Sequence, residues 1–161
     1  YEIGVRLVGS EMCIRDRPCA ERNKLRLLRY IKAEFKIETS SILEQTKKQL
    51  DEYFTGNRKT FDIPLHPVGT DFQKKVWNAL LDIPYSETRS YKEIAISMGT
   101  PNGTRAVAGA IGSNGISILI PCHRVIGSNH SLTGFAGGLA TKRFLLELEA
   151  EQKQHKMLIF K

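Results

Sequence analysis

The sequence has little of what marks membrane and secreted proteins. None of its apolar runs approaches the roughly 20 residues that a membrane-spanning helix needs. A secretory signal, with its basic start and apolar stretch, is not visible at the N-terminus. The chain has three cysteines, an odd number without the spacing of a disulfide framework. We therefore expect reduced thiols, a cytoplasmic location and no membrane partner.

Signatures of zinc sites and of repeat proteins are missing as well. The chain has no Cys-x2-Cys pair and no His-x3-His pair, and it has no internal repeat or low-complexity tract. We expect no metal site. At 161 residues, 41% hydrophobic and 25% charged, the chain is long enough for one ordinary domain, or for one domain with a small appendage.

Acidic residues are nearly missing from one stretch of the chain, residues 89–142. Between residues 89 and 142 the sequence has a single acid, Glu93. The bases in the same stretch are Arg89, Lys92, Arg105, Arg124 and Lys142. Together with the formal net charge of +7, this basic stripe favours a polyanion as partner. A solvated basic face is the alternative that charge alone leaves open.

The first 17 residues do not follow the pattern of the rest. They have neither the period of an amphipathic helix nor that of a strand, and they show no helix-capping pattern. They also look like the translated adapter sequence that contaminates some metagenomic assemblies. We expect residues 1–17, which include Cys13, to be foreign to the fold.

Two helices are predicted before the middle of the chain. Apolar side chains recur at helical spacing from residue 25 to 35. Residues 39–57 predict a second helix, capped by Ser40 or Ser41 and ended by Gly56. Its expected apolar stripe is Ile42, Leu50, Tyr53 and Phe54.

An extended, proline-broken stretch follows at residues 58–69 and is typical of a linker. We place a domain boundary there, near residues 64 to 70. Residues 18–66 are then the remnant of an N-terminal domain, and residues 67–161 form the C-terminal domain.

The C-terminal domain has clearer helix signals. Residues 70–83 begin with a capping Thr70 or Asp71. The expected apolar face of this helix is Phe72, Val76, Trp77, Leu80 and Leu81. Residues 90–99 and 104–114 predict two short helices joined by a glycine-containing turn, the pattern of a helix-turn-helix.

The rest of the C-terminal domain is predicted as one strand and one helix. Residues 115–121 predict a buried strand, and residues 133–152 a glycine-rich loop that leads into a final amphipathic helix. The expected fold class is α/β in the α+β sense. A mainly helical C-terminal domain with a helix-turn-helix and a short strand follows a truncated N-terminal domain.

The second helix of the pair has an unusual composition for a DNA-reading helix. Residues 104–112 are mostly alanine, glycine and other small or apolar residues, with one long polar side chain, Arg105. Reading the major groove needs several side chains that reach base edges. Two interpretations stay open: close packing against another helix, or entry into a minor groove with Arg105 wedged into the base stack.

Residues 118–127, ILIPCHRVIG, place Cys122, His123 and Arg124 side by side after a proline. A buried structural cysteine is the common alternative to a nucleophile. A nucleophilic cysteine needs a base within hydrogen-bond reach, and neighbouring residues on a strand point to opposite faces. His123 therefore serves Cys122 only if Pro121 turns the strand, or through a bridging water. Arg124 and a charged His123 would favour the reactive thiolate.

Residues 69–150 closely resemble the O6-alkylguanine-DNA alkyltransferases, also called methylated-DNA–protein-cysteine methyltransferases. The helix LEQTKKQLDEYFTGN resembles the family's lead-in segment. The stretches that carry the resemblance follow the family's order and spacing: GTDFQKKVWNALLDIPYSETRSYKEIA, GTPNGTRAVAGAIGSN, ILIPCHRVIG and LTGFAGGLATKRFLLELE. Most of the small β-sheet that opens the family's N-terminal domain is absent, which fits a truncated reading frame.

The resemblance implies a DNA-repair protein that needs no cofactor. As a monomer it would move alkyl groups from O6 of guanine, and from O4 of thymine, irreversibly to its own cysteine. The resemblance also implies the catalytic roles. Cys122 accepts the alkyl group, His123 takes the thiol proton through a water, and Glu149 orients and charges His123. Tyr91 gives a proton to the leaving guanine, and Asn114 ties the helix-turn-helix to the active-site turn.

The partner implied by the resemblance is double-stranded DNA that contains O6-alkylguanine, bound in its minor groove. Arg105 matches the arginine that replaces the flipped base in the stack. The residues expected to contact DNA are Thr104, Arg105, Ala106, Gly109 and Arg124. Those expected to line the substrate pocket are Ser117, Phe135, Ala136 and Gly137.

Two pocket positions depart from the family's pattern. Phe135 stands where the family usually has a tyrosine, and Ser117 stands where some members have a proline, so the range of alkyl groups stays open. Two other functions stay open as well: a helix-turn-helix DNA binder with a structural cysteine, and a cysteine hydrolase acting on an acyl substrate.

Overall fold

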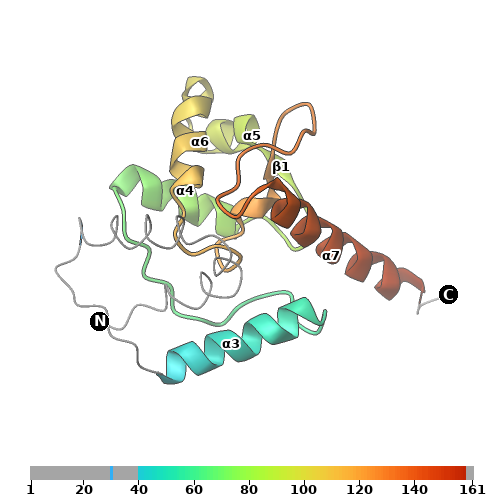
Figure 1. The fold of residues 1–161 in the computed structure, drawn as a ribbon. Coiled ribbons are helices and arrows are strands. Elements are labelled where there is room, and N and C mark those ends of the chain that lie inside the picture. The colour runs from blue at the N-terminus through green and yellow to red at the C-terminus, as the bar shows by residue number, and fades with distance from the viewer. Residues whose placement is uncertain (1–29, 31–39, 159–161) are drawn as a thin grey trace. The chain divides into compact units, whose positions relative to one another are not determined.

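The computed structural model describes residue 30 and residues 40–158, with side chains up to residue 152 (Figure 1). Within these residues, no helix is both long and apolar enough to cross a membrane. The leader predicted for residues 1–17 and the helix predicted for residues 25–35 lie outside the described part.

The chain divides into two compact units, Tyr1–Gly69 and Thr70–Lys161. In the first unit, residues 58–69 contain neither helix nor strand, in keeping with the prolines of this stretch.

The described helix of the N-terminal unit is α3 (Ser41–Phe54). Ser40 is its N-cap, because the Ser40 hydroxyl accepts a hydrogen bond from a backbone amide of the first turn at 3.3 Å. Gly56 follows the end of the helix in the left-handed conformation, with φ of 82°. Ile42 and Phe54 of the predicted stripe are only partly buried. The side chains that the helix buries are Thr46, Gln49, Leu50 and Tyr53.

The described part of the C-terminal unit is mainly helical, as the sequence predicted (Figure 1). Its longer helices are α4 (Asp71–Leu81), α5 (Tyr91–Ser97), α6 (Thr104–Gly112) and α7 (Leu139–Leu158). Its short elements are the 3-10 turns η2 (Pro101–Gly103) and η3 (Cys122–Arg124) and the parallel strand pair β1 (Arg89–Ser90) and β2 (Val125–Ile126).

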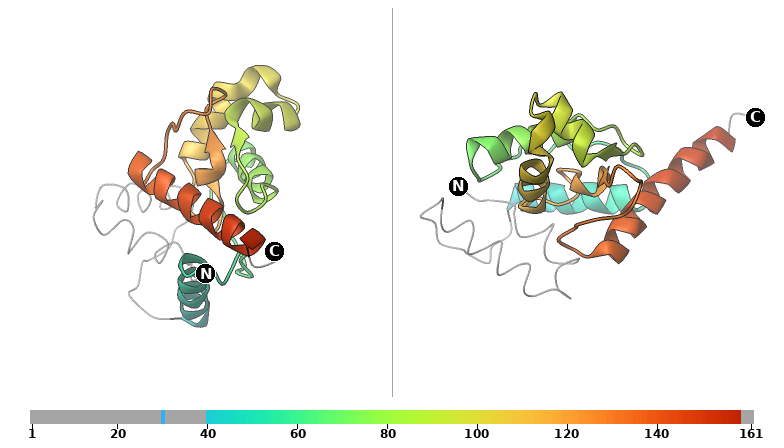
Figure 2. Two further views of the ribbon diagram at one scale, coloured as in Figure 1. Left: turned by 90° about the vertical axis from the view of Figure 1, so that its right-hand side faces the viewer. Right: turned by 90° about the horizontal axis from the view of Figure 1, so that it is seen from above.

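Local sequence signals explain where these helices begin and end. Thr70 and Ser90 each form a capping box, with Gln73 and Glu93 as the partners that return the hydrogen bond. Gly99 follows α5 with φ of 72°, a conformation that favours glycine. The chain then turns into α6, and the two helices lie side by side (Figure 2). This arrangement agrees with the predicted helix-turn-helix.

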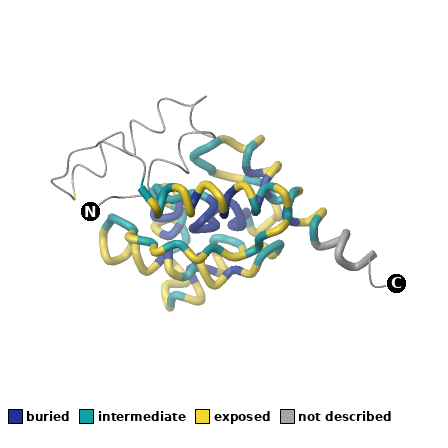
Figure 3. The backbone as a smooth tube through the Cα atoms, turned by 90° about the horizontal axis from the view of Figure 1, so that it is seen from below, coloured by how far each residue is buried: buried dark blue, intermediate teal, exposed yellow. Residues whose placement is uncertain are grey.

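The core of the C-terminal unit forms between α4 and α6. Trp77 on α4 is 2% exposed, and its indole Nε1 donates a hydrogen bond to the Ala110 carbonyl at 2.8 Å. The same helix was predicted to bury Phe72 and Leu81, but these side chains are 38% and 46% exposed. They lie at the margins of the apolar stripe, so the buried face is narrower than predicted. Along the described helices, exposed, intermediate and buried positions alternate (Figure 3).

Residues 115–121 are not a strand, so this prediction was wrong. The segment is a turn closed by an isolated bridge between Ser117 and Ile120. Ile118 has φ of 73°, which is incompatible with an extended strand. Burial was predicted correctly, since Ile118, Leu119 and Ile120 are at most 6% exposed. An apolar run reports burial but not backbone conformation, which explains the error.

Candidate active site

Cys122 begins the 3-10 turn η3, directly after Pro121. The Cys122 amide donates to the Ile120 carbonyl at 2.8 Å, and the Arg124 amide donates to the Pro121 carbonyl at 3.0 Å. Three residues complete one turn of such a helix, so the neighbouring side chains point in different directions. The thiol is 6% exposed, and it is the free cysteine of the described residues.

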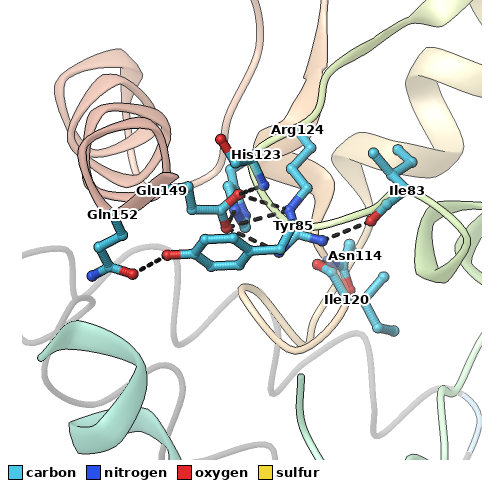
Figure 4. Close-up of polar contacts among 9 residues, drawn as sticks. Ile83, Tyr85, Asn114, Ile120, His123, Arg124, Glu149 and Gln152 are labelled. Carbon is cyan, nitrogen blue, oxygen red and sulfur yellow. Dashed lines mark hydrogen bonds and ion pairs between the residues drawn. The ribbon is translucent and has the colours of Figure 1, made fainter. Parts of the chain in front are cut away.

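Asn114 links the end of α6 to this turn. Its side-chain amide donates to Cys122 Sγ at 3.1 Å and to the Ile120 carbonyl at 3.1 Å. Its Oδ1 accepts a hydrogen bond from the Ile116 amide at 2.9 Å. Asn114 is 3% exposed, so its orientation is fixed by these bonds, and Figure 4 shows it beside Ile120.

The environment keeps Cys122 as a thiol at neutral pH. Burial raises its pKa, and this effect outweighs the opposing influence of the Asn114 amide, the Lys142 charge and the Ser117 hydroxyl. A protonated thiol is a weak nucleophile and needs a base. Arg124, which the sequence suggested as one of two activating cations, instead directs its guanidinium to the Glu149 carboxylate.

His123 is the neighbouring titratable group and is fully buried. Its Nε2 lies 2.9 Å from Glu149 Oε1 on α7 (Figure 4). Its Nδ1 is buried and has no hydrogen-bond partner among the described residues. Burial lowers the pKa of His123, although Glu149 opposes this effect. A neutral ring that donates from Nε2 to the carboxylate keeps Nδ1 as a proton acceptor.

Glu149 is also fully buried and holds more than one partner. Its carboxylate accepts hydrogen bonds from Arg124 Nε at 3.0 Å and Nη2 at 2.9 Å, and from the Ser86 amide at 2.8 Å. Burial alone would raise its pKa, but hydrogen bonds from His123 and Arg124 lower the pKa of Glu149 to about 2. The carboxylate is therefore charged throughout the physiological pH range.

The prediction that Arg124 contacts DNA conflicts with its position. Arg124 is 6% exposed, and its guanidinium donates to Glu149 and, at 2.7 Å, to the Ile83 carbonyl. It also lies 5.5 Å above the ring of Tyr85, whose hydroxyl donates to Gln152 (Figure 4). A side chain buried in this way is not presented to a phosphate at the surface, because the fork of its guanidinium faces the Glu149 carboxylate.

Tyr91 lies at the start of α5 and reaches the loop before α7. Its hydroxyl donates to the Thr133 carbonyl at 3.0 Å. Burial raises the pKa of Tyr91, so the phenol stays protonated and available as an acid. The phenol also interacts electrostatically with Cys122. Tyr91 is therefore close enough to Cys122 for their charges to interact.

The predicted pocket residues are all half-buried. Ser117 lies near the thiol, since its hydroxyl influences the pKa of Cys122. Phe135, Ala136 and Gly137 belong to the loop that precedes α7. A Cβ on Gly137 would come within 3.0 Å of the Phe135 ring, so glycine lets this loop fold back on itself.

The other four predicted DNA-binding residues lie on α6. Arg105, Ala106 and Gly109 are exposed, and Thr104 is half-buried. A Cβ on Gly109 would meet no described atom within 4 Å. Close packing within the described part of the chain is therefore not the reason for the small residues at these exposed positions.

Lys142 belongs to the site, although it was predicted only as one base of the basic stripe. Lys142 is fully buried, and its Nζ donates to the Val125 and Thr133 carbonyls at 2.5 and 2.6 Å. The sequence does contain a signal for the burial of Lys142, because its spacing from the buried Leu145 and Glu149 places all three on one face of a helix. No group of His, Cys, Asp or Glu in the described residues has the geometry of a metal site.

Comparison with protein families gives two matches along the chain. The model described as "6-O-methylguanine DNA methyltransferase, DNA binding domain" matches residues 71–151. The model described as "6-O-methylguanine DNA methyltransferase, ribonuclease-like domain" matches residues 7–67. The second match includes part of residues 1–17, whose foreign origin stays a prediction.

Individual relatives agree with these matches. A methylated-DNA–protein-cysteine methyltransferase of Methanosarcina barkeri is 56% identical over 113 residues, 70% of this chain and 72% of its own length. A protein of the same name from Mycobacterium tuberculosis is 53% identical over 112 residues, 70% of this chain and 68% of its own length.

Solved structures show the same likeness. The crystal structure of Mycobacterium tuberculosis OGT in complex with DNA aligns with a TM-score of 0.67 at 53% identity, over 68% of each chain. The O6-methylguanine-DNA methyltransferase of Pyrococcus kodakaraensis aligns with a TM-score of 0.61 at 26% identity, over 84% of this chain and 77% of that one. The chain therefore belongs to the 6-O-methylguanine DNA methyltransferase family of DNA-repair enzymes, also named methylated-DNA–protein-cysteine methyltransferases.

Proposed function

We propose that the protein repairs O6-alkylguanine in double-stranded DNA by moving the alkyl group to Cys122. The observation that carries the proposal is the arrangement of buried side chains around one thiol. Asn114 donates to the sulfur at 3.1 Å, and Glu149 holds the neighbouring His123 at 2.9 Å. The names of the relatives support methylated DNA as the substrate.

The proposed chemistry is a single displacement at carbon. His123 takes the thiol proton at Nδ1 through a water, and the charged Glu149 stabilises the imidazolium that forms. The sulfur attacks the carbon attached to O6, so that an S–C bond forms as the C–O6 bond breaks. Tyr91 gives a proton to the ring nitrogen of the leaving guanine. His123 has gained one proton from the thiol and Tyr91 has lost one, so the total charge is conserved.

Each molecule reacts once in this proposal. The product at Cys122 is a thioether, which has no good leaving group and which water does not open as it opens a thioester. Cys13 and Cys19, the other cysteines of the chain, lie outside the described residues and have no resolving motif around them. The acyl hydrolase alternative would instead turn over repeatedly.

DNA binding in this proposal uses the outer face of α6. The exposed Ala106 and Gly109 let the helix backbone come close to a minor groove, and the exposed Arg105 fills the space of the flipped base. The open surroundings of Gly109 support this assignment, because no described residue packs there. O4-alkylthymine is a second substrate of the same class.

The decisive experiment measures the intact mass of the protein after mixing with duplex that contains O6-methylguanine. We expect one methyl group per protein, placed by peptide mapping on Cys122, and no transfer to a Cys122→Ala variant. A protein that binds the duplex without gaining mass would be a non-catalytic DNA binder. Continued product formation beyond one methyl per protein would refute single use. The cytoplasmic location and the monomeric state stay predictions.

A further inference from the structure

Lys142 is a fully buried lysine on α7 to which the proposed reaction gives no role. Burying an ammonium group is costly unless hydrogen bonds and charges compensate for the lost water. The Nζ of Lys142 donates to two carbonyls, Val125 O at 2.5 Å and Thr133 O at 2.6 Å. An apolar side chain would fill the same space without this cost.

The two carbonyls belong to two different parts of the active site. Val125 directly follows the η3 turn that begins with Cys122. Thr133 belongs to the loop before α7, and its carbonyl also accepts the Tyr91 hydroxyl at 3.0 Å. Lys142 and Tyr91 therefore meet at one oxygen, and Nζ lies 5.8 Å from the centre of the Tyr91 ring.

The charge of Lys142 also acts on the groups that exchange protons. The titratable groups that face it are Tyr91 from α5 and Cys122 and His123 from η3. Burial raises the pKa of Cys122, and Lys142 opposes this effect. Burial lowers the pKa of Lys142 itself to about 8, so the ammonium form still predominates at neutral pH.

We propose that Lys142 is a positioning residue of the transfer reaction, which ties the turn of Cys122 to the loop that receives the Tyr91 hydroxyl. Its contact with Thr133 fixes the acceptor that orients the Tyr91 phenol. Its contact with Val125 holds the same ammonium beside the thiol. The inference rests on the proposed function, in which Tyr91 and Cys122 act on one substrate.

The test compares Lys142→Met with Arg143→Met, an exposed neighbour on the same helix. The first measurement is the single-turnover methyl-transfer rate at saturating duplex with O6-methylguanine. The second is the pH midpoint of Cys122 labelling by iodoacetamide, followed by peptide mass mapping, which needs no DNA. We expect Lys142→Met to lower the rate by about tenfold or more and to raise the labelling midpoint. Arg143→Met should leave the midpoint unchanged.

A purely structural role gives a different result. Lys142→Met would then lower the melting temperature but keep both the saturated rate and the labelling midpoint, which would overturn the proposal. If this variant does not fold, Lys142→Gln, which keeps an amide donor without the charge, undergoes the same two measurements. If the wild type reacts with iodoacetamide at Cys122 but transfers no methyl group, the proposed function fails. A labelling midpoint that is higher in Lys142→Met than in the wild type would still place Lys142 beside the thiol.

Discussion

Replacing Glu149 by glutamine is the most informative single change in the site. The substitution keeps the shape of the side chain but removes its charge. In the wild type, the carboxylate lies 2.9 Å from His123 Nε2 and accepts hydrogen bonds from the Arg124 guanidinium at 2.9 and 3.0 Å and from the Ser86 amide at 2.8 Å. In the variant, an NH2 group replaces one carboxylate oxygen. Its two N–H donors face His123, Arg124 and the Ser86 amide, which are themselves donors, so hydrogen bonds are lost.

The expected cost follows from the burial of the partner. Arg124 is 6% exposed, and it keeps its charge when its counter-ion is removed. Breaking a buried ion pair in this way costs about 3–5 kcal/mol. The same contacts lower the pKa of Glu149 from 4.5 to about 2, which corresponds to roughly 3 kcal/mol at neutral pH.

The sign of the pH dependence is also fixed. The pKa of Glu149 is lower in the folded protein, so its stabilising contribution is present above about pH 4.5. The contribution is lost as the pH falls toward 2, where the folded carboxylate is protonated. The difference in unfolding free energy between the wild type and Glu149→Gln should therefore narrow over this range.

The assay is urea unfolding followed by the fluorescence of Trp77, the only tryptophan of the chain. Trp77 is 2% exposed and lies on α4, so it reports on the C-terminal unit. The matched control is Glu147→Gln, an exposed carboxylate on the same helix, which should change stability by about 0.5 kcal/mol or less. The reasoning would be refuted if Glu149→Gln were as stable as the wild type at pH 7. It would also be refuted if the difference in their unfolding free energies did not change with pH.

Three further substitutions test other parts of the site. Tyr91→Phe should slow transfer without changing the melting temperature much, and an unchanged single-turnover rate would remove its role as acid. Gly109→Leu should fold, because a Cβ there meets nothing within 4 Å. It should weaken duplex binding by about tenfold, ~1.4 kcal/mol, and an affinity equal to that of the wild type in an anisotropy titration would contradict the proposal that this face of α6 contacts DNA. Asn114→Ala removes the hydrogen bond to Cys122 Sγ, so the pH midpoint of iodoacetamide labelling should rise; a fall would contradict this.

Several features of the protein could be predicted from the sequence alone because they depend on residues close in the chain. The capping boxes begin α4 at Thr70 and α5 at Ser90. Glycine at position 56 and at position 99 takes the left-handed conformation just after a helix. The order and spacing of the motifs around Cys122 were enough to predict the family, which the comparisons confirm.

Other features depended on contacts between distant parts of the chain. Arg124 looked like one base of a DNA-binding stripe, but Glu149, 25 residues away, pairs with it in the interior. Lys142 looked like another base of that stripe, but its partners are the Val125 and Thr133 carbonyls. Charge is visible in a sequence, whereas burial is set by the tertiary fold, because only a packed interior both removes water and supplies the compensating partner.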